Sequence, residues 1–331
     1  MIGKIALEEH FVPAELTELI TNPGWAPEAW QHTLNLLVDT EERLEKMDRA
    51  GVELAVLSLG SNGIQDVLDP ARAVAVAGEV NDALARAVAT HPDRYLALAA
   101  LPMIDVDAAT AELDRCVHTL GFKGALVNGY SSDGSLERGC YYDDPRYDPL
   151  WERFAALKVP FYLHPRNPLP DQRRIYQGRE QLLGPTWAFG AETAVHALRM
   201  LVGGVFDRFP ELTVVLGHLG ELLPFAIRRL EQRLSRRTDV DLARPAAEYL
   251  RENFYLTTSG NYHTPSLIGI LLELGTDRLM FAADYPFEEL DDGATWLDSV
   301  PISDGDRRKI ASENARRLLR LPQSDVQAQP T

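Results

Sequence analysis

The chain has 331 residues, of which 45% are hydrophobic, and its formal net charge is −16 at pH 7. This length allows one large domain or two ordinary ones with a substantial buried core. The excess of acidic residues argues against binding to nucleic acids and to anionic membranes, because both attract basic surfaces.

The cysteines and the N-terminus indicate the compartment. The two cysteines, Cys116 and Cys140, form no CxxC pair and no disulfide framework. The N-terminus lacks the basic start and apolar run of a signal peptide, and no apolar run approaches the ~20 residues of a membrane span. We therefore expect a cytoplasmic protein with no membrane partner.

Eight apolar runs alternate with helical patterns, and we interpret these runs as strands. The predicted strands are residues 3–11, 52–59, 95–101, 122–128, 159–164, 212–218, 254–259 and 278–284. The helical patterns are residues 40–50, 70–91, 108–120, 148–157, about 185–205, about 219–236, 265–274 and 304–319.

This alternation predicts an α/β fold. Near-continuous apolar strands are expected where helices cover a parallel sheet, and eight β/α units in this length fit a (β/α)8 TIM barrel. A doubly wound open sheet is the structural alternative, although no GxGxxG motif follows the first strand. We expect residues 1–321 to form one barrel domain and residues 322–331 to form a frayed tail.

Two long insertions interrupt the pattern, at residues 11–38 and 165–185. Loops of this length inside a compact domain are usually functional or disordered. The first contains Trp25 and Trp30, and aromatic side chains favour a lid that packs over something. We therefore interpret both segments as lid-like insertions.

The first strand ends in acidic residues and an imidazole. Side chains two apart in a strand share a face, which predicts two sets. One face carries Ala6, Glu8 and His10, and the other carries Ile5, Leu7 and Glu9. A carboxylate beside an imidazole at a strand end forms half of a metal site, although a polar strand end that faces water shows the same pattern.

Other predicted strands also end in residues that bind metals. His10, His164 and His218 end the first, fifth and sixth strands, and Asp284 ends the eighth. Catalytic residues of TIM barrels lie at these strand ends. A single such residue is more often a helix cap or a packed core group, but Glu8, His10, His164 and Asp284 would converge on the barrel axis. Two imidazoles and two carboxylates suit one divalent transition metal.

The remaining polar candidates have simpler interpretations. His196 lies inside a helical pattern and is expected to be packed. Asn128 ends the fourth strand and could face the pocket or cap a turn. Arg228 and Arg229 lie within a helix, where two solvated charges are expected. The other histidines are expected in loops or on helix surfaces, namely His32, His91, His118 and His263.

Four motifs carry a resemblance to a known family. They are Glu8-Glu9-His10, Leu163-His164-Pro165-Arg166-Asn167-Pro168, Leu216-Gly217-His218-Leu219-Gly220-Glu221 and Asp284-Tyr285-Pro286-Phe287-Glu288. Together they resemble the amidohydrolase-superfamily decarboxylases, in particular those that act on γ-resorcylate (2,6-dihydroxybenzoate) and 2,3-dihydroxybenzoate. The resemblance spans residues 3–321. It departs at Gly60-Ser61-Asn62-Gly63, where we would expect Asn-Ala-Pro-Ala.

The resemblance implies a distorted (β/α)8 barrel of the amidohydrolase type. It implies a homo-oligomer, a tetramer or a dimer, with one divalent metal ion, Zn²⁺ or Mn²⁺, and no organic cofactor. The metal ligands that it implies are Glu8, His10, His164 and Asp284. The catalytic residues that we expect from it are Asp284, His218 and Glu221, and the expected substrate-binding residues are Arg229, Asn128 and Phe287.

The implied reaction is non-oxidative decarboxylation of an ortho-hydroxybenzoate, a small aromatic acid, to a phenol and CO2. It is reversible in principle, and Asp284 would be the acid that protonates the ring carbon. Two rivals remain open. One is hydrolysis of a lactone or amide by a metal-bound water. The other is a non-catalytic barrel, which predicts no functional loss after His164→Ala.

Overall fold

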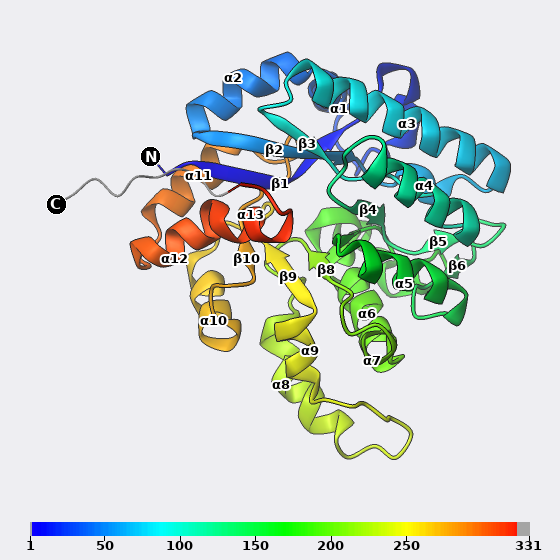
Figure 1. Cartoon of the computed structure of the whole chain (residues 1–331). Coiled ribbons are helices and arrows are strands. Elements are labelled where there is room, and N and C mark those ends of the chain that lie inside the picture. The colour runs from blue at the N-terminus through cyan, green and yellow to red at the C-terminus, as the bar shows by residue number, and fades with distance from the viewer. Residues whose placement is uncertain (1, 323–331) are drawn as a thin grey trace.

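The computed structural model describes residues 2–322, along which eight parallel strands alternate with helices (Figure 1). The eight predicted strands are all present, and most are shorter than the apolar runs that contain them. Their bounds are β1 (Lys4–Phe11), β2 (Val52–Leu59), β3 (Tyr95–Ala97), β4 (Ala125–Asn128), β7 (Phe161–His164), β8 (Val214–Leu216), β9 (Phe254–Thr257) and β10 (Leu279–Met280).

The strands close into a ring. Two parallel sheets have the strand orders β1-β2-β3 and β10-β9-β8-β7-β4. Parallel bridges join their edges, one between Ala99 and Ala125 and the other between Glu9 and Tyr285. The prediction of a distorted (β/α)8 barrel is confirmed, and the doubly wound alternative is wrong. The carboxyl ends of all eight strands therefore meet at one opening.

The inner face of β1 differs from the predicted alternation. Ile5 and Leu7 pack inside the barrel with side chains from other strands, whereas Ala6 packs outside. The register of β1 against β2 shifts between Ala6 and Glu9, as at a β-bulge, which adds one residue to a strand. The bulge places Glu8 inside the barrel on the same side as Leu7, and it turns Glu9 towards the helices.

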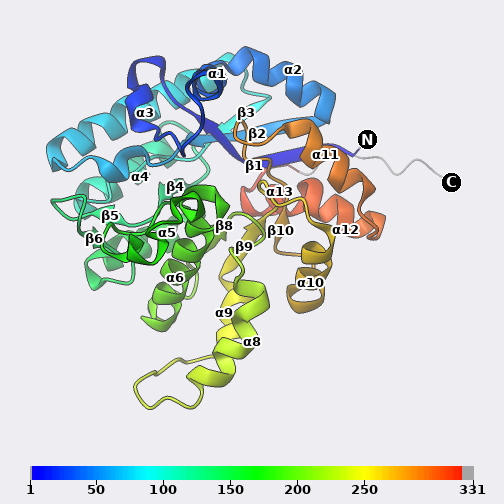
Figure 2. The same cartoon turned by 180° about the vertical axis from the view of Figure 1, so that it is seen from behind.

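Most of the helices match the predicted patterns and lie outside the barrel (Figure 2). The matched helices are α2 (Thr40–Ala50), α3 (Pro70–Thr90), α4 (Val106–His118), α5 (Asp148–Leu157), α6 (Ala188–Val202), α8 (Leu223–Leu234) and α10 (Thr264–Leu274). The last predicted helix consists of α12 (Asp304–Arg308), a π-helical turn (Lys309–Glu313) and α13 (Asn314–Leu318).

Several elements were not predicted. They are the helices α1 (Pro27–Val38), α7 (Val205–Arg208), α9 (Ala246–Glu252) and α11 (Leu290–Ser299), and the hairpin of β5 (Ser131–Ser132) and β6 (Gly139–Cys140). Short 3₁₀ turns cover Ala14–Leu19, Gly63–Asp66, Pro145–Tyr147, Gln172–Tyr176, Glu180–Leu182 and Gly184–Thr186. The loop-like interpretation of residues 11–38 is therefore wrong for its second half, which is helical. Residues 323–331, predicted as a tail, lie outside the described residues.

Local sequence explains the bounds of α2, which packs beside the barrel near β1. The helix begins after Asp39, whose carboxylate accepts hydrogen bonds from the backbone N–H groups of Glu41 and Glu42. It ends before Gly51, which has a φ of 68° and takes the left-handed conformation that closes many helices. The predicted stop at Gly51 is confirmed, and α2 is fixed at both ends.

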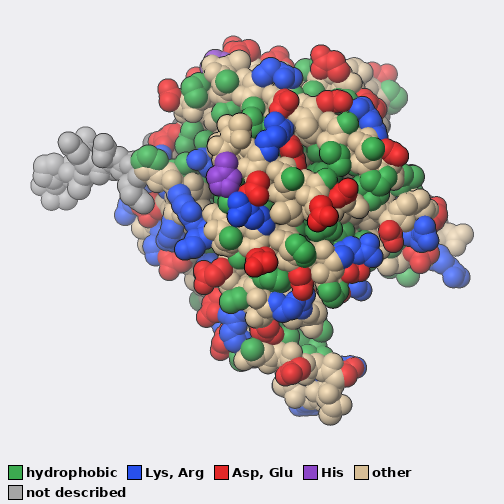
Figure 3. Space-filling model, turned by 45° about the vertical axis from the view of Figure 1, so that its right-hand side comes forward, with side chains coloured by type: hydrophobic (Ala, Val, Ile, Leu, Met, Phe, Trp, Pro, Cys, Tyr) green, Lys and Arg blue, Asp and Glu red, His purple; other side chains and the backbone are tan. Residues whose placement is uncertain are grey.

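Two features describe the outer surface. Acidic and basic side chains are interspersed over the face drawn in Figure 3, together with scattered hydrophobic ones. The helices α8 and α9, with the connection between them, project away from the barrel in Figures 1 and 2. None of the helices in residues 2–322 is both long enough and apolar enough to cross a membrane.

Candidate active site

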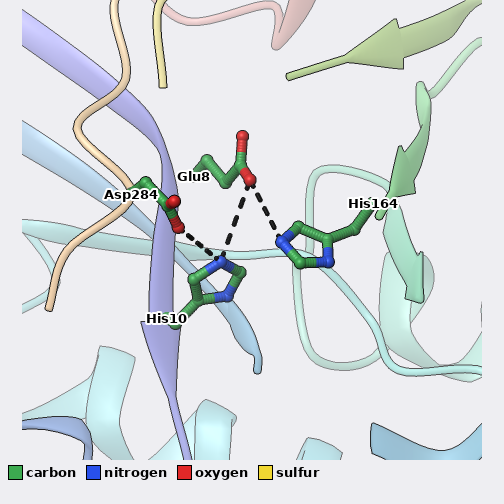
Figure 4. A group of neighbouring side chains, drawn as sticks. All are labelled: Glu8, His10, His164 and Asp284. Carbon is green, nitrogen blue, oxygen red and sulfur yellow. Dashed lines mark ion pairs between the residues drawn. The ribbon is translucent and has the colours of Figure 1, made fainter. Parts of the chain in front are cut away.

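The four side chains predicted as metal ligands meet at the opening of the barrel (Figure 4). Glu8 and His10 come from β1, His164 ends β7, and Asp284 follows β10. One donor atom from each lies within 4.8 Å of the other three. His164 Nε2 lies 3.2 Å from Glu8 Oε1, and His10 Nε2 lies 3.1 Å from Asp284 Oδ1. The structure therefore brings together the residues that the strand ends predicted.

Glu8 is held through one oxygen and faces the cluster with the other. Its Oε2 accepts hydrogen bonds from the hydroxyl groups of Tyr162 and Ser259. Gly217 leaves room for this oxygen, because a Cβ there would lie 2.8 Å from it. Burial opposes ionisation of Glu8, but the neighbouring imidazoles, first that of His218, lower its pKa. Glu8 is thus a fixed carboxylate whose Oε1 faces the imidazoles.

These residues fit a divalent metal ion. Within residues 2–322, the buried atoms Glu8 Oε1, His10 Nε2 and Asp284 Oδ1 have no hydrogen-bond partner. Burying unpaired polar atoms is costly, and one cation would interact with all three. Burial lowers the pKa of His10, which favours the neutral imidazole that binds metals. Two imidazoles and two carboxylates match ligands used for zinc and manganese.

His218 and Glu221 extend the cluster on the side of Asp284. His218 Nδ1 lies 2.7 Å from Glu221 Oε1, and His218 Nε2 lies 3.5 Å from Asp284 Oδ2. Asp284 therefore faces His10 with one oxygen and His218 with the other. Burial opposes protonation of His218, but Glu221, Glu8 and Asp284 together raise its pKa well above the usual value. The imidazole of His218, between Glu221 and Asp284, can therefore hold a proton next to the carboxylate of Asp284.

A left-handed turn shapes the segment that carries this pair. All five residues of the range 218–222 have φ values between 51° and 82°, and only Gly220 among them is a glycine. The left-handed conformation costs other residues roughly 1–2 kcal/mol each, and such strain is often found at functional sites. The turn allows His218 and Glu221, three residues apart, to form their hydrogen bond before α8 begins.

A cavity of about 100 Å³ opens beside the cluster and reaches His164, His218 and Asp284. Its apolar wall is formed by Pro23, Trp25, Pro185, Phe189 and Phe287, and its polar wall includes Ser61, Asn62 and Asn167. The ring centroids of Trp25 and Phe287 lie 5.9 Å apart, in an edge-to-face arrangement. Both predicted insertions contribute to this wall. Phe287 lies where a substrate contact was expected, whereas Phe189 and the Ser61–Asn62 pair were not predicted.

Arg229 does not line this cavity within the single chain, so the substrate contact that the resemblance implied for it stays a prediction. The buried side chains of α8 are Leu223, Pro224 and Ile227. Successive helical residues turn by about 100°, so Arg229, two residues after Ile227, points away from that face. It is exposed, and it is not among the described residues that line the cavity.

Asn128 lies behind the cavity wall and is buried. Its backbone N–H donates a hydrogen bond of 3.2 Å to Gln65 Oε1, and its side-chain amide donates one of 3.4 Å to the carbonyl oxygen of Gly60. It is not among the described residues that line the cavity. Asn128 therefore supports the loop that carries Ser61, and the substrate contact expected of it stays a prediction.

His196 is packed inside the protein, as predicted. It lies in α6 with no exposed surface, and its Nε2 accepts a hydrogen bond of 3.0 Å from the backbone N–H of Tyr142. Burial lowers its pKa from 6.5 to about 3. His32, His91 and His118 lie at or near the surface and away from the cluster, as expected, and His263 precedes α10.

His196 should make the protein sensitive to acid. Between pH 6.5 and pH 3 the unfolded chain takes up a proton that the folded chain excludes, so stability is lost as the pH falls through this window. Relative to His196→Gln, the wild type should lose about 2 kcal/mol more unfolding free energy between pH 7 and pH 5. Denaturant unfolding at both pH values measures this difference. Parallel pH profiles of the unfolding free energy for wild type and His196→Gln would contradict the assignment.

Comparisons with known proteins show the family of this chain. The family model described as amidohydrolase matches residues 23–321. A γ-resorcylate decarboxylase from Rhizobium radiobacter is 47% identical over 327 residues, covering 97% of this chain and 99% of that protein. A crystal structure of 2,6-dihydroxybenzoate decarboxylase complexed with 2,6-dihydroxybenzoate is 47% identical, with a TM-score of 0.94, and the match covers 97% of this chain and 100% of the other.

A second solved structure adds a metal. The dihydroxybenzoic acid decarboxylase from Polaromonas sp., with bound manganese and the inhibitor 2-nitroresorcinol, is 47% identical to this chain. Its TM-score is 0.93, and the match covers 97% of each chain. The resemblance found in the motifs is confirmed by these matches.

Proposed function

The chain belongs to the amidohydrolase family, and we propose that it is a metal-dependent carboxy-lyase acting on an ortho-hydroxybenzoate of the 2,6-dihydroxybenzoate type. The observation that carries this proposal is the group of four ligand-type side chains beside a small cavity, three of which have donor atoms without a hydrogen-bond partner in residues 2–322. The relatives that are 47% identical and named for this reaction support it.

The size of the cavity and the charges of its lining side chains support a small substrate with one carboxylate. An engineered cavity of about 150 Å³ can hold benzene, so a cavity of about 100 Å³ leaves no room for a ligand of two rings. None of the described residues that line it is a lysine or an arginine. The imidazole of His218 already faces Glu221 and Asp284, so a second carboxylate on the ring would lack a cationic partner of its own, and burying it unpaired would be costly. A 2,3-dihydroxybenzoate is the nearest alternative substrate.

The bound ion would supply Lewis acidity and orient the substrate oxygens. Glu8, His10, His164 and Asp284 would hold it, and we propose manganese, as in the Polaromonas relative, with zinc as the alternative. We propose that no organic cofactor takes part, because the reaction requires neither an oxidant nor a reductant.

The residues beside the ligands handle the proton. Burial opposes ionisation of Asp284, but hydrogen bonds from His10 and His218 lower its pKa, so the proton is held by His218 at the start. We assign Asp284 Oδ2 as the atom that receives this proton from His218 Nε2, 3.5 Å away, and gives it to the ring carbon bearing the carboxylate, while Glu221 keeps the imidazole oriented through Nδ1. The bond between that carbon and the carboxylate then breaks, CO2 leaves, and the ring regains its aromaticity. Phe287 and Trp25 hold the ring and exclude water.

A panel of substrates tests the reaction class. Purified protein, analysed for metal and loaded with Mn²⁺ or Zn²⁺, is incubated with hydroxybenzoates while CO2 is measured. We expect CO2 from 2,6-dihydroxybenzoate and none from 3- or 4-hydroxybenzoate, which lack the ortho hydroxyl, and a chelator should stop the reaction. Uptake of water by a lactone or amide without CO2 release would favour the hydrolytic rival. Stoichiometric metal without any turnover would favour a non-catalytic barrel.

We further propose that a second copy of the chain covers an apolar patch beside the site, giving a dimer or tetramer. The patch consists of Trp187, Leu222, Phe225 and Leu272, which are between 49% and 85% exposed. Phe225 of α8 lies against Gly269 of α10, so the two helices share this surface. Light scattering should give a mass at least twice that of the chain, and Phe225→Asp should lower this mass.

The cytoplasmic location of the protein stays a prediction.

A further inference from the structure

A buried polar pair lies behind the ligand-bearing strand ends, on the side away from the cavity. Glu9 stands between Glu8 and His10 in β1, and the bulge turns it towards α2, which carries Arg43. Both Glu9 and Arg43 have no exposed surface. Acidic and basic side chains are rarely buried completely unless they are paired. The complete burial of Glu9 and Arg43 therefore requires a physical reason.

Each member of the pair holds the backbone of one candidate ligand. Glu9 Oε1 accepts a hydrogen bond of 2.9 Å from the backbone N–H of Ala283, the residue before Asp284. Arg43 Nη2 donates a hydrogen bond to the carbonyl oxygen of His10. The two side chains therefore act on the two strand ends whose ligands, His10 and Asp284, face each other across the metal site.

These strand ends meet where the barrel closes. One of the two bridges that close the barrel joins Glu9 and Tyr285, and β10 itself is only two residues long. Three backbone hydrogen bonds join β1 to the segment that contains β10 and Tyr285, and two of them involve ligand residues. Asp284 N donates to Glu8 O at 2.9 Å, and His10 N donates to Tyr285 O at 2.7 Å. Three of the four candidate ligands thus depend on a short contact between strands.

Fold stability alone does not explain the pair. Within residues 2–322, Glu9 Oε2, Arg43 Nε and Arg43 Nη1 are buried without a hydrogen-bond partner. The guanidinium of Arg43 lies over the ring of Tyr285, 4.8 Å from its centroid. No ion pair or hydrogen bond joins Glu9 directly to Arg43 among the described residues, so a direct contact between them does not offset the cost of burying both side chains. A role in holding the backbone geometry explains the burial of these unpaired polar atoms better than a contribution to the stability of the fold does.

We propose that Glu9 and Arg43 are positioning residues of the metal centre. They touch neither the ion nor the substrate, and they fix the backbone at His10 and at Ala283–Asp284 so that the donor atoms meet at one ion. The inference rests on the proposed metal centre and adds to it two residues outside the ligand set. Residues that orient metal ligands typically change metal affinity by about 10–100-fold when they are replaced.

The test measures metal affinity rather than activity. Mn²⁺ and Zn²⁺ are titrated into metal-free protein in competition with a chelator, and thermal unfolding of the metal-free protein is recorded in parallel. Glu9→Leu removes the acceptor for Ala283, and Arg43→Met keeps the apolar stem but deletes the donor to His10. Each should weaken metal binding by about 10–100-fold. Glu9→Gln keeps an acceptor oxygen and should restore affinity close to that of the wild type.

Arg49→Met is the matched control on the same helix. Arg49 lies six residues after Arg43, its side chain is 56% exposed, and it pairs with Asp291 at 3.5 Å. It reaches neither strand end, so its replacement should leave metal affinity unchanged. The contrast between Arg43→Met and Arg49→Met separates an effect of the buried donor from a general effect of removing charge from α2.

The outcomes distinguish the two proposals. If the wild type binds no stoichiometric metal, the proposed metal centre fails, and the positioning role fails with it. If the wild type binds metal and both Glu9→Leu and Arg43→Met keep its affinity while losing thermal stability, the pair is merely structural and the positioning role is overturned. If Arg43→Met does not fold, the comparison of Glu9→Leu with Glu9→Gln decides the same question.

Discussion

Replacing His164 with alanine should remove most of the bound metal and abolish decarboxylation while the barrel stays folded. His164 Nδ1 lies 3.0 Å from the carbonyl oxygen of Pro165, and this contact leaves Nε2 to face Glu8 Oε1 at 3.2 Å. A metal-binding histidine typically donates its other ring N–H in this way. Because His164 would be a direct ligand, its loss should weaken metal binding by more than about 100-fold, above the range for orienting residues.

The barrel should tolerate this change because β7 is held on both sides. It pairs in parallel with β4 and with β8, and neither pairing uses the imidazole. Metal analysis and thermal melts measure the result. Saturating Mn²⁺ should raise the melting temperature of the wild type by mass action, and it should not raise that of His164→Ala.

His118→Ala is the control for His164→Ala. His118 ends α4, and its side chain is 59% exposed, so its loss should change neither metal content nor turnover. Stoichiometric metal in His164→Ala would show that the ligand assignment is wrong. Full activity without that metal would instead favour a reaction that does not depend on this cluster.

The metal cluster was predictable because it depends mainly on strand order. Parallel strands of a closed barrel bring their carboxyl ends to one opening, so His10, His164 and Asp284 had to approach one another once the eight strands were recognised. No knowledge of loops or side-chain packing was needed. The left-handed φ of 75° at Asp284 refines the direction of this side chain but not the strand end from which it comes.

The features that could not be predicted depend on contacts between distant segments. The bulge in β1 is visible only in its pairing with β2. No pattern within residues 4–11 indicates the extra residue that turns Glu8 inward. The cavity wall takes Ser61 and Phe189 from separate loops, whose positions depend on packing. The family resemblance implied a substrate contact for Arg229, which the single chain carries on its exposed surface, so this contact stays a prediction.

Asp284→Asn should separate metal binding from proton transfer. Asparagine has nearly the same shape as aspartate, and it is one of the few residues that adopt the left-handed conformation readily. The φ of 75° at this position should therefore be retained. The amide oxygen can still face the metal, whereas the amide nitrogen cannot pass a proton from His218 to the ring. We expect weaker metal binding, which excess Mn²⁺ should overcome.

In metal-loaded Asp284→Asn, kcat for 2,6-dihydroxybenzoate should fall by about 10²–10⁴-fold, the usual contribution of a positioned acid or base. Binding of the substrate, measured by calorimetry on the loaded protein, should change far less, because the aromatic wall of Trp25 and Phe287 is intact. Asp292→Asn, at an exposed site in α11, is the matched control and should keep normal turnover. If Asp284→Asn with full metal turned over within about tenfold of the wild type, below the range for such an acid, the proton would come from another group. His218 would then be the first candidate, because its Nε2 faces the same cavity.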